Sequence, residues 1–273
     1  MSLNLGIIAS SKAASGGGGG TDADAQAFFN RVTAAGGTLS ATEQTAINTL
    51  TVSLKSNSLW SLMKAIYPMV GASSSACSQN LKSSSFTGTF SANWTYTSAG
   101  VKGNGSGTFF NTNFNNQSNW TSTSNASMGF ISATNESGVI CDMGSCPTAL
   151  SGANSTTIYS RYNGSYYGGM NCTSVAPGTT NASSIGFFVT TRITTSAYSI
   201  YKRGSSTINL TTTDAIGTNP NTTIYLGAAH EGVNPALPSA KIYNFCFLGD
   251  GLTQTQVDTF YSCLQTFNSS LGR

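Results

Sequence analysis

The sequence is poor in charged side chains. Only 8% of its 273 residues are Asp, Glu, Lys or Arg, against about 25% in ordinary soluble domains. The twelve Lys and Arg residues are scattered along the chain, and the net charge is +3. No basic stripe predicts nucleic acid as a partner, and no acidic block predicts a solvating tail.

Long apolar runs are absent as well. No stretch of about 18 apolar residues exists, so we expect no membrane insertion. The opening stretch from Leu3 to Ala9 is short, interrupted and not preceded by a basic residue. It does not fit the apolar core of a signal peptide, so we expect the protein to be made in the cytoplasm.

Metal-binding patterns are equally scarce. His230 is the only histidine, and the six cysteines form no C-x-x-C pair, so we expect no zinc site and no cofactor. No Asp-x-Asp/Asn loop predicts calcium, although a site assembled from scattered oxygen ligands stays open. We expect buried free thiols at two positions and leave one disulfide open among three others: first Cys246 and Cys263, then Cys141, Cys146 and Cys172.

Catalytic patterns are missing too. Glycosidases use two carboxylates that flank the sugar bond. In the concanavalin type these usually lie on one strand, but no two acidic residues beyond the N-terminal helical stretch lie two or four apart. There is no G-x-S-x-G elbow, one histidine leaves few options for a triad, and the glycine runs lack the lysine of a phosphate loop. We therefore expect a protein that is not an enzyme and has no catalytic residues.

What the sequence does contain is typical of β-structure. Aromatics make up 10% of the residues, and Ser, Thr, Asn and Gly are abundant. Short β-type runs alternate with turn clusters, which predicts an antiparallel sandwich or jelly roll. The expected strands lie at residues 87–97, 107–111, 127–133, 138–142, 155–162, 185–193, 197–202, 206–211, 224–228 and 241–247.

A C-terminal helix should pack on the last two strands. Thr253 fits an N-cap, and Gln256 completes a capping box. Leu252 precedes the cap and can pack on Val257 as a hydrophobic staple. One helical face then carries an apolar stripe, formed by Val257, Phe260, Tyr261, Leu264 and Phe267.

The N-terminal part divides into an arm and a helical module. Residues 1–20 contain five consecutive glycines and read as a flexible arm. Its apolar side chains either stay disordered or dock on a neighbouring chain, and we expect the second in an assembly: Leu3, Leu5, Ile7 and Ile8. Residues 21–71 are expected to form three helices, the third from Leu59 to Ile66. Residues 72–273 should form the β-domain with the C-terminal helix.

Three segments resemble the concanavalin A/laminin-G type of jelly roll: residues 200–204, 224–228 and 247–253 with the closing helix. Three further stretches resemble structural proteins of tailed bacteriophages. They are Asp22 to Phe28, the long Ala46 to Gly71 stretch and the closing Leu271-Gly272-Arg273. The likeness implies a mainly β fold: an antiparallel jelly-roll sandwich with an N-terminal α-helical anchoring module and a C-terminal helix.

The phage resemblance also implies a function. It predicts a virion component made in the host cytoplasm, such as a head or tail decoration or a fibre, that assembles with capsid, neck or tail proteins and with copies of itself. The alternative is an adhesin module that binds host-surface glycans through exposed aromatics. The candidates for such contacts are Tyr166, Tyr167 and Trp120, because aromatic rings stack on sugars.

Overall fold

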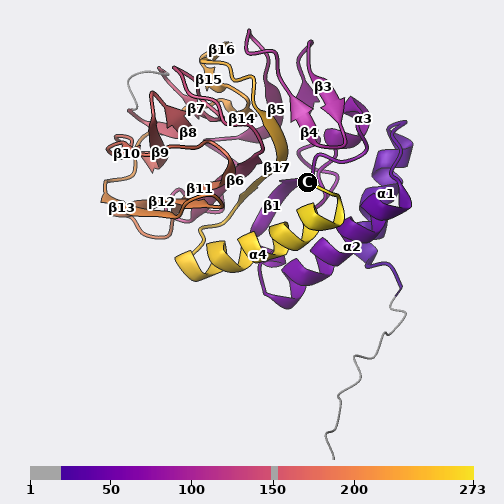
Figure 1. Cartoon of the computed structure of the whole chain (residues 1–273). Coiled ribbons are helices and arrows are strands. Elements are labelled where there is room, and N and C mark those ends of the chain that lie inside the picture. Colours follow the sequence, from indigo (N-terminus) through magenta and orange to yellow (C-terminus); the bar gives the residue numbers. More distant parts are fainter. Residues whose placement is uncertain (1–19, 149–152) are drawn as a thin grey trace, which may run out of the picture.

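The computed structural model describes residues 20–148 and 153–273, and it consists of two β-sheets packed face to face with a layer of helices on one of them (Figure 1). Sheet A has eight strands in the order β13-β12-β11-β6-β17-β4-β3, with β1 also paired to β17. These strands are β1 Met63–Tyr67, β3 Thr95–Thr97, β4 Gly100–Lys102, β6 Ala126–Ser132, β11 Gly186–Arg192, β12 Ala197–Arg203, β13 Ile208–Thr213 and β17 Ile242–Gly249.

Sheet B has nine strands, seven of them in the order β10-β9-β8-β7-β14-β5-β2, with β15 and β16 added beside β7. The strands are β2 Thr89–Phe90, β5 Phe110–Asn115, β7 Met143–Cys146, β8 Ser155–Tyr162, β9 Ser165–Cys172, β10 Thr179–Thr180, β14 Thr223–Leu226, β15 Ala229–Glu231 and β16 Asn234–Ala236. Apart from the parallel pair of β15 and β7, the pairing is antiparallel. The expected β-sandwich is confirmed.

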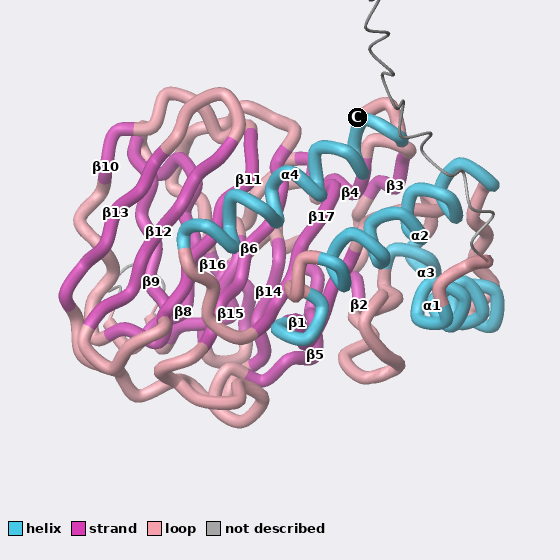
Figure 2. Tube along the Cα trace, turned by 90° about the horizontal axis from the view of Figure 1, so that it is seen from below, coloured by secondary structure: helices cyan, strands magenta, loops and turns pink. Residues whose placement is uncertain are grey.

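The helices cover the outer face of sheet A. They are α1 Ala23–Ala34, α2 Ala41–Ser56, the short α3 Ser74–Cys77 and α4 Gln254–Ser270, with one 3-10 turn at Trp60–Leu62. Figure 2 shows α4 and α2 lying across the strands of this sheet. Their apolar faces share one buried cluster with outward-facing side chains of sheet A, such as Phe187 and Phe247.

The C-terminal helix follows the sequence prediction closely. The Thr253 side chain accepts from the backbone N–H of Gln256, and the Gln256 side chain accepts from the backbone N–H of Thr253. Leu252 and Val257 are both buried in the cluster beneath the helix. Phe260 lies against the rings of Phe245, Phe247 and Phe187, with ring centroids 5.8, 4.9 and 5.6 Å away. The predicted capping box and apolar stripe are confirmed.

The predicted third helix at Leu59 to Ile66 is wrong. Only a 3-10 turn forms there, and the chain then enters strand β1, which pairs antiparallel with β17. The strand is favoured because alternate side chains reach two cores: Ile66 packs under the helices, whereas Ala65 and Tyr67 pack between the sheets. Residues 21–71 thus pack on sheet A through their helices and contribute strand β1 to that sheet.

Two of the predicted strands differ from the structure in their bounds. The run at 87–97 is divided between the sheets as β2 and β3, and the chain turns at Asn93, whose φ is 68°. The strand expected at 138–142 lies at β7 instead, and the preceding Asp142 is fully buried. The apolar arm residues, namely Leu3, Leu5, Ile7 and Ile8, lie outside the described residues.

All six cysteines are buried free thiols. Cys246 and Cys263 lie in the two cores, as the sequence predicts, and no disulfide joins Cys141, Cys146 or Cys172. Burial raises the pKa of the Cys146 thiol to about 12. Because the thiolate is the reactive form, these cysteines are chemically inert in the folded state.

Removal of the Phe260 ring should destabilise the whole protein, since α4 and sheet A meet on it. We expect Phe260→Ala to lower the free energy of unfolding by about 3–5 kcal/mol, the usual cost of deleting a buried phenylalanine ring. Denaturant titration followed by circular dichroism measures the change. Gln265→Ala, on the exposed side of α4, is the matched control. Equal stability of the two variants would contradict this packing.

Candidate binding face

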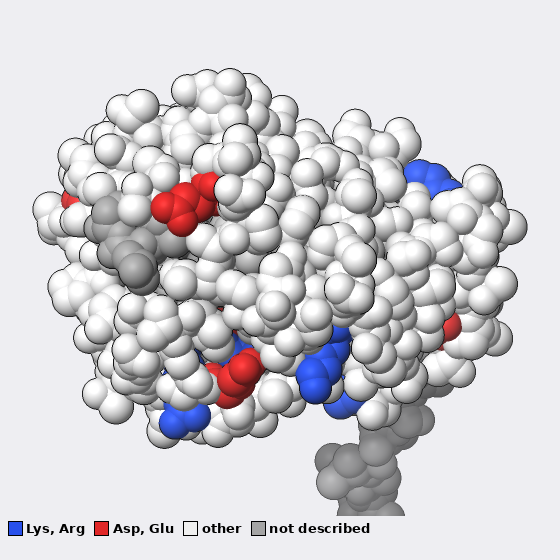
Figure 3. Space-filling view, turned by 90° about the horizontal axis from the view of Figure 1, so that it is seen from above, with Lys and Arg blue, Asp and Glu red and all other residues white. Residues whose placement is uncertain are grey.

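The outer face of sheet B lies opposite the helix layer. Since the helices pack on sheet A, they leave this face uncovered, and it is the candidate binding face. Figure 3 shows the side of the molecule opposite to that of Figure 2, and charged residues are few there. A small buried cluster on this face contains Cys141, Cys146, Tyr159 and Ala229, with Tyr162 and Tyr167 packed against it. The partly buried rings of Tyr162 and Tyr167 are therefore candidates for contact on a surface with few charges.

Three rings stack in parallel on this face. Ile224 and Leu226 of β14 point into the core, so the alternation of the strand turns Tyr225 outward. The Tyr225 ring lies between Phe109, at 4.3 Å with an interplanar angle of 13°, and His230, at 3.9 Å with 8°. Phe109 and His230 are half-buried, whereas Tyr225 is buried. The outer two rings thus present part of their surface to solvent.

His230 is held in place by the strand that carries Tyr225. Its Nδ1 lies 2.9 Å from the carbonyl oxygen of Thr223, so this nitrogen carries the proton and donates it. Burial lowers the pKa of the imidazole below its ordinary value of 6.5, although hydrogen bonds to the backbone at Thr223 and Gly232 oppose the shift. The ring is therefore a fixed neutral stacking partner at neutral pH.

A second aromatic group lies on β8 and β9. Tyr162 makes edge-to-face contacts with Tyr159 and Tyr167, with ring centroids 5.8 Å apart in both pairs. Tyr162 and Tyr167 are half-buried, and Tyr159 is 5% exposed. Gly178 packs on the Tyr167 ring, where an added Cβ would lie 2.3 Å from a ring carbon. Close approach of the backbone therefore requires glycine at this position.

Two of the three predicted contact residues are in the core. Tyr166 is fully buried, and its hydroxyl donates to the carbonyl oxygen of Val189 over 2.9 Å. Trp120 is 8% exposed, and its indole N–H donates to the Asn116 side chain over 3.0 Å. The expectation that Tyr166 is exposed is wrong, because β9 alternates and turns Tyr167 outward and Tyr166 inward. Of the three, only Tyr167 lies on the outer face.

The stack of Phe109, Tyr225 and His230 was not predicted from the sequence. A signal for it exists in the alternation of Ile224, Tyr225 and Leu226, which places the tyrosine opposite the core. Nothing in the sequence pattern brings Phe109 beside Tyr225, because Phe109 directly precedes β5, and β5 meets β14 only through their pairing in the sheet. His230 reaches the Tyr225 ring because the chain turns between β14 and β15, which carry these two residues.

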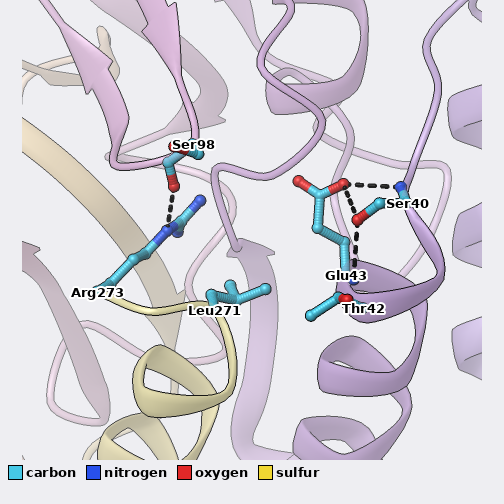
Figure 4. A pocket seen from close by; sticks show the side chains of 6 residues that line it. All are labelled: Ser40, Thr42, Glu43, Ser98, Leu271 and Arg273. Atoms are coloured by element: carbon cyan, nitrogen blue, oxygen red, sulfur yellow. Dashed lines mark hydrogen bonds between the residues drawn. The ribbon is translucent and has the colours of Figure 1, made fainter.

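A hollow of about 320 Å³ lies on the other side of the molecule, between α2 and the C-terminus (Figure 4). It is lined by Ser40, Thr42, Glu43, Ser98, Leu271 and Arg273. Its two charged side chains are already engaged. Glu43 accepts from the backbone of Ser40 and of Gly71, and Arg273 donates to the carbonyl oxygens of Ser98 and Met69. The hollow therefore lies where α2 and the C-terminus meet, and it is a poor ligand site because its charged groups already have partners.

The described residues hold no group of three or more His, Cys, Asp or Glu side chains that could bind a metal ion. Within the same residues, no helix is long and apolar enough to cross a membrane. Several carboxylates outside the first two helices are engaged with cations, in the pairs Lys64–Asp250, Arg192–Asp214, Arg203–Asp258 and Lys241–Asp142. In the Arg192–Asp214 and Lys241–Asp142 pairs both side chains are buried, at most 5% exposed.

No family model and no curated protein matches this chain. Among solved structures, domain 4 of AbnA, a GH43 extracellular arabinanase from Geobacillus stearothermophilus in complex with arabinotriose, is 12% identical with a TM-score of 0.48, over 73% of this chain and 98% of that one. The Ruminococcus gnavus IT-sialidase CBM40 bound to α2,3-sialyllactose is 11% identical with a TM-score of 0.34, over 50% of this chain and 80% of that one. These likenesses are too distant to assign a ligand here.

The single histidine allows a direct test of the stack. We expect the pKa of His230, measured by NMR titration of its ring protons, to lie below 6.5. The unfolded chain then binds a proton more readily than the folded one, so stability is lost as pH falls from 6.5 toward the folded pKa. His230→Gln should lack that part of the pH dependence. A pKa at or above the ordinary value would contradict the buried stack.

Proposed function

We propose that this protein is a non-enzymatic structural component of a tailed-bacteriophage virion, which displays its sandwich from the particle as a decoration or fibre domain. The observation that supports the proposal best is the way the stretches with phage resemblance interlock. Arg273, from the closing Leu-Gly-Arg, donates to the carbonyl oxygens of Pro68 and Met69, which belong to the Ala46 to Gly71 stretch. Segments more than 200 residues apart in sequence therefore form one unit.

Three further hydrogen bonds hold the same unit together. Glu43, in the first turn of α2, accepts from the backbone N–H of Gly71 over 2.7 Å. Arg31 of α1 donates to the backbone carbonyl of Asn80 over 2.9 Å, and the Asn80 side chain accepts from the N–H of Ile66 over 2.9 Å. The helices are thus fastened to the strand and loop that follow them. Ile66 and Gly71 belong to the Ala46 to Gly71 stretch that carries the phage resemblance, so these contacts hold that stretch against its neighbours.

The surface suits a displayed domain. With the helices laid over sheet A, the outer face of sheet B faces away from them and carries few charges (Figure 3). We propose copies of the same chain and other capsid, neck or tail proteins as partners, and the virion as the location. The buried carboxylates of Asp142 and Asp214 are paired with Lys241 and Arg192 inside the fold, which supports a structural role for them.

Localisation on particles tests the proposal. Antibodies raised against the recombinant protein should label gradient-purified tailed particles from the source culture at one fixed position in immunoelectron microscopy. The protein should also sediment with those particles after washing in high salt. Recovery of the protein only from the soluble fraction, with unlabelled particles, would refute the virion role.

Glycan binding by the outer face of sheet B is the second candidate, which the half-buried rings of Phe109, His230, Tyr162 and Tyr167 favour. We expect Tyr167→Ala to weaken binding to an oligosaccharide found on a glycan array by up to about tenfold, the equivalent of one aromatic stacking contact. Tyr261→Ala, a half-buried ring on the helix side, is the control and should bind normally. Absence of binding to any glycan on the array would reject this candidate and leave the virion role intact.

A further inference from the structure

A fully buried ion pair joins the two sheets. Lys241 lies just before β17 of sheet A, and Asp142 lies just before β7 of sheet B. The Lys241 Nζ is 2.7 Å from the Asp142 Oδ1, and both side chains are 0% exposed. The desolvation of two charges costs several kcal/mol per ion in real proteins, so such a pair is an expensive way to hold two sheets together.

The two oxygens of the Asp142 carboxylate have different surroundings. Oδ2 accepts from the Ser160 backbone N–H over 2.8 Å and from the Ser160 hydroxyl over 2.7 Å. Oδ1 instead faces the Lys241 amine and the Tyr243 hydroxyl, each 2.7 Å away. Two fixed donors on one oxygen form the arrangement that stabilises an oxyanion in acyl transfer. The amine and the phenol lie beside the other oxygen.

We propose that Lys241 and Asp142 condense into an intramolecular isopeptide bond. A proton passes from the ammonium to the carboxylate, and the neutral Nζ then attacks the Cγ carbon of Asp142. In the tetrahedral intermediate, negative charge develops on Oδ2, where the two Ser160 donors hold it. The new Nζ–Cγ bond forms, the Cγ–Oδ1 bond breaks, and Oδ1 leaves as water with two of the three ammonium protons.

Tyr243 and Ser160 act as proton carriers in this step. The Tyr243 hydroxyl donates to the departing Oδ1 over 2.7 Å, and the tyrosinate is reprotonated by the proton that Nζ releases. The Ser160 hydroxyl accepts from the Lys241 Nζ over 3.0 Å, so it links nucleophile and oxyanion site. No oxidant, metal or co-reactant is needed, because an ammonium and a carboxylate yield an amide and one water molecule.

Burial favours the product over the ion pair. The amide carries no charge, so its formation removes the desolvation penalty of both groups. Contact at 2.7 Å in a rigid core also makes the reaction effectively unimolecular, which in well-oriented systems is worth many orders of magnitude in rate. The new bond would tie sheet A to sheet B and close a loop between positions 142 and 241.

The mass of the denatured protein tests the proposal. We expect the purified full-length chain, incubated at neutral pH, to be lighter than its sequence by one water molecule. Tryptic digestion should leave the bond after Lys241 uncut and yield a branched peptide that contains Asp142 and Lys241. Lys241→Arg keeps the charge but removes the amine nucleophile, and this variant should have its full mass.

An internal control is available in the same digest. Lys55 and Asp22 make an equally short contact of 2.6 Å, but their side chains are 33% and 17% exposed. Because solvent reaches this pair and keeps both charges hydrated, it should remain unlinked. Folded wild-type protein of full mass, with normal cleavage after Lys241, would overturn the proposal. A water deficit that persists in Lys241→Arg, or that maps to another site, would overturn it as well.

Discussion

Strand β17 is the element on which both apolar cores depend. It is buried on both faces, so Phe245 and Phe247 pack under the helices while Cys246 and Leu248 pack between the sheets. Since side chains alternate along a strand, a slip of one residue would exchange the two sets and spoil both cores at once. The strand also pairs with β6 on one edge and with β1 and β4 on the other. The helix layer also packs on β6, β11 and β12, but β17 contributes two phenylalanines to that cluster and two residues to the core between the sheets.

Local signals in the sequence predicted the elements well where one residue determines the structure. Thr253 and Gln256 define the start of α4, and the alternation at 197–202 and 241–247 predicts the strands that form as β12 and β17. Prediction failed where a distant partner decides the conformation. Met63 to Tyr67 has spacing compatible with a helix, and only the free edge of β17 makes it a strand. The same limit applies to the candidate binding face, because Tyr166 and Tyr167 cannot be told apart until the register of β9 is known.

Charge is distributed in an unusual way in this protein. The chain has few ionisable residues, yet three of its cations, Arg192, Lys202 and Lys241, are completely buried. Arg192 donates to the backbone carbonyl of Met170 in β9, and Lys202 donates to the Asn181 side chain and the Ser183 carbonyl. The outer surface is left to Ser, Thr and Asn, whose interactions are not screened by salt as those of exposed charges are. Contacts made by this surface should thus depend on shape and hydrogen bonding, with little response to ionic strength.

The position of β17 has a consequence for how the chain folds. Strand β1 must wait for a partner that follows it by about 180 residues, and α1 and α2 cannot bury their apolar faces before sheet A exists. During synthesis the N-terminal half therefore emerges with its Phe28, Leu50 and Ile66 side chains unprotected. Exposed apolar surface of this kind promotes aggregation of intermediates. Folding of this protein in the cell therefore competes kinetically with aggregation until β17, a late strand, has been synthesised.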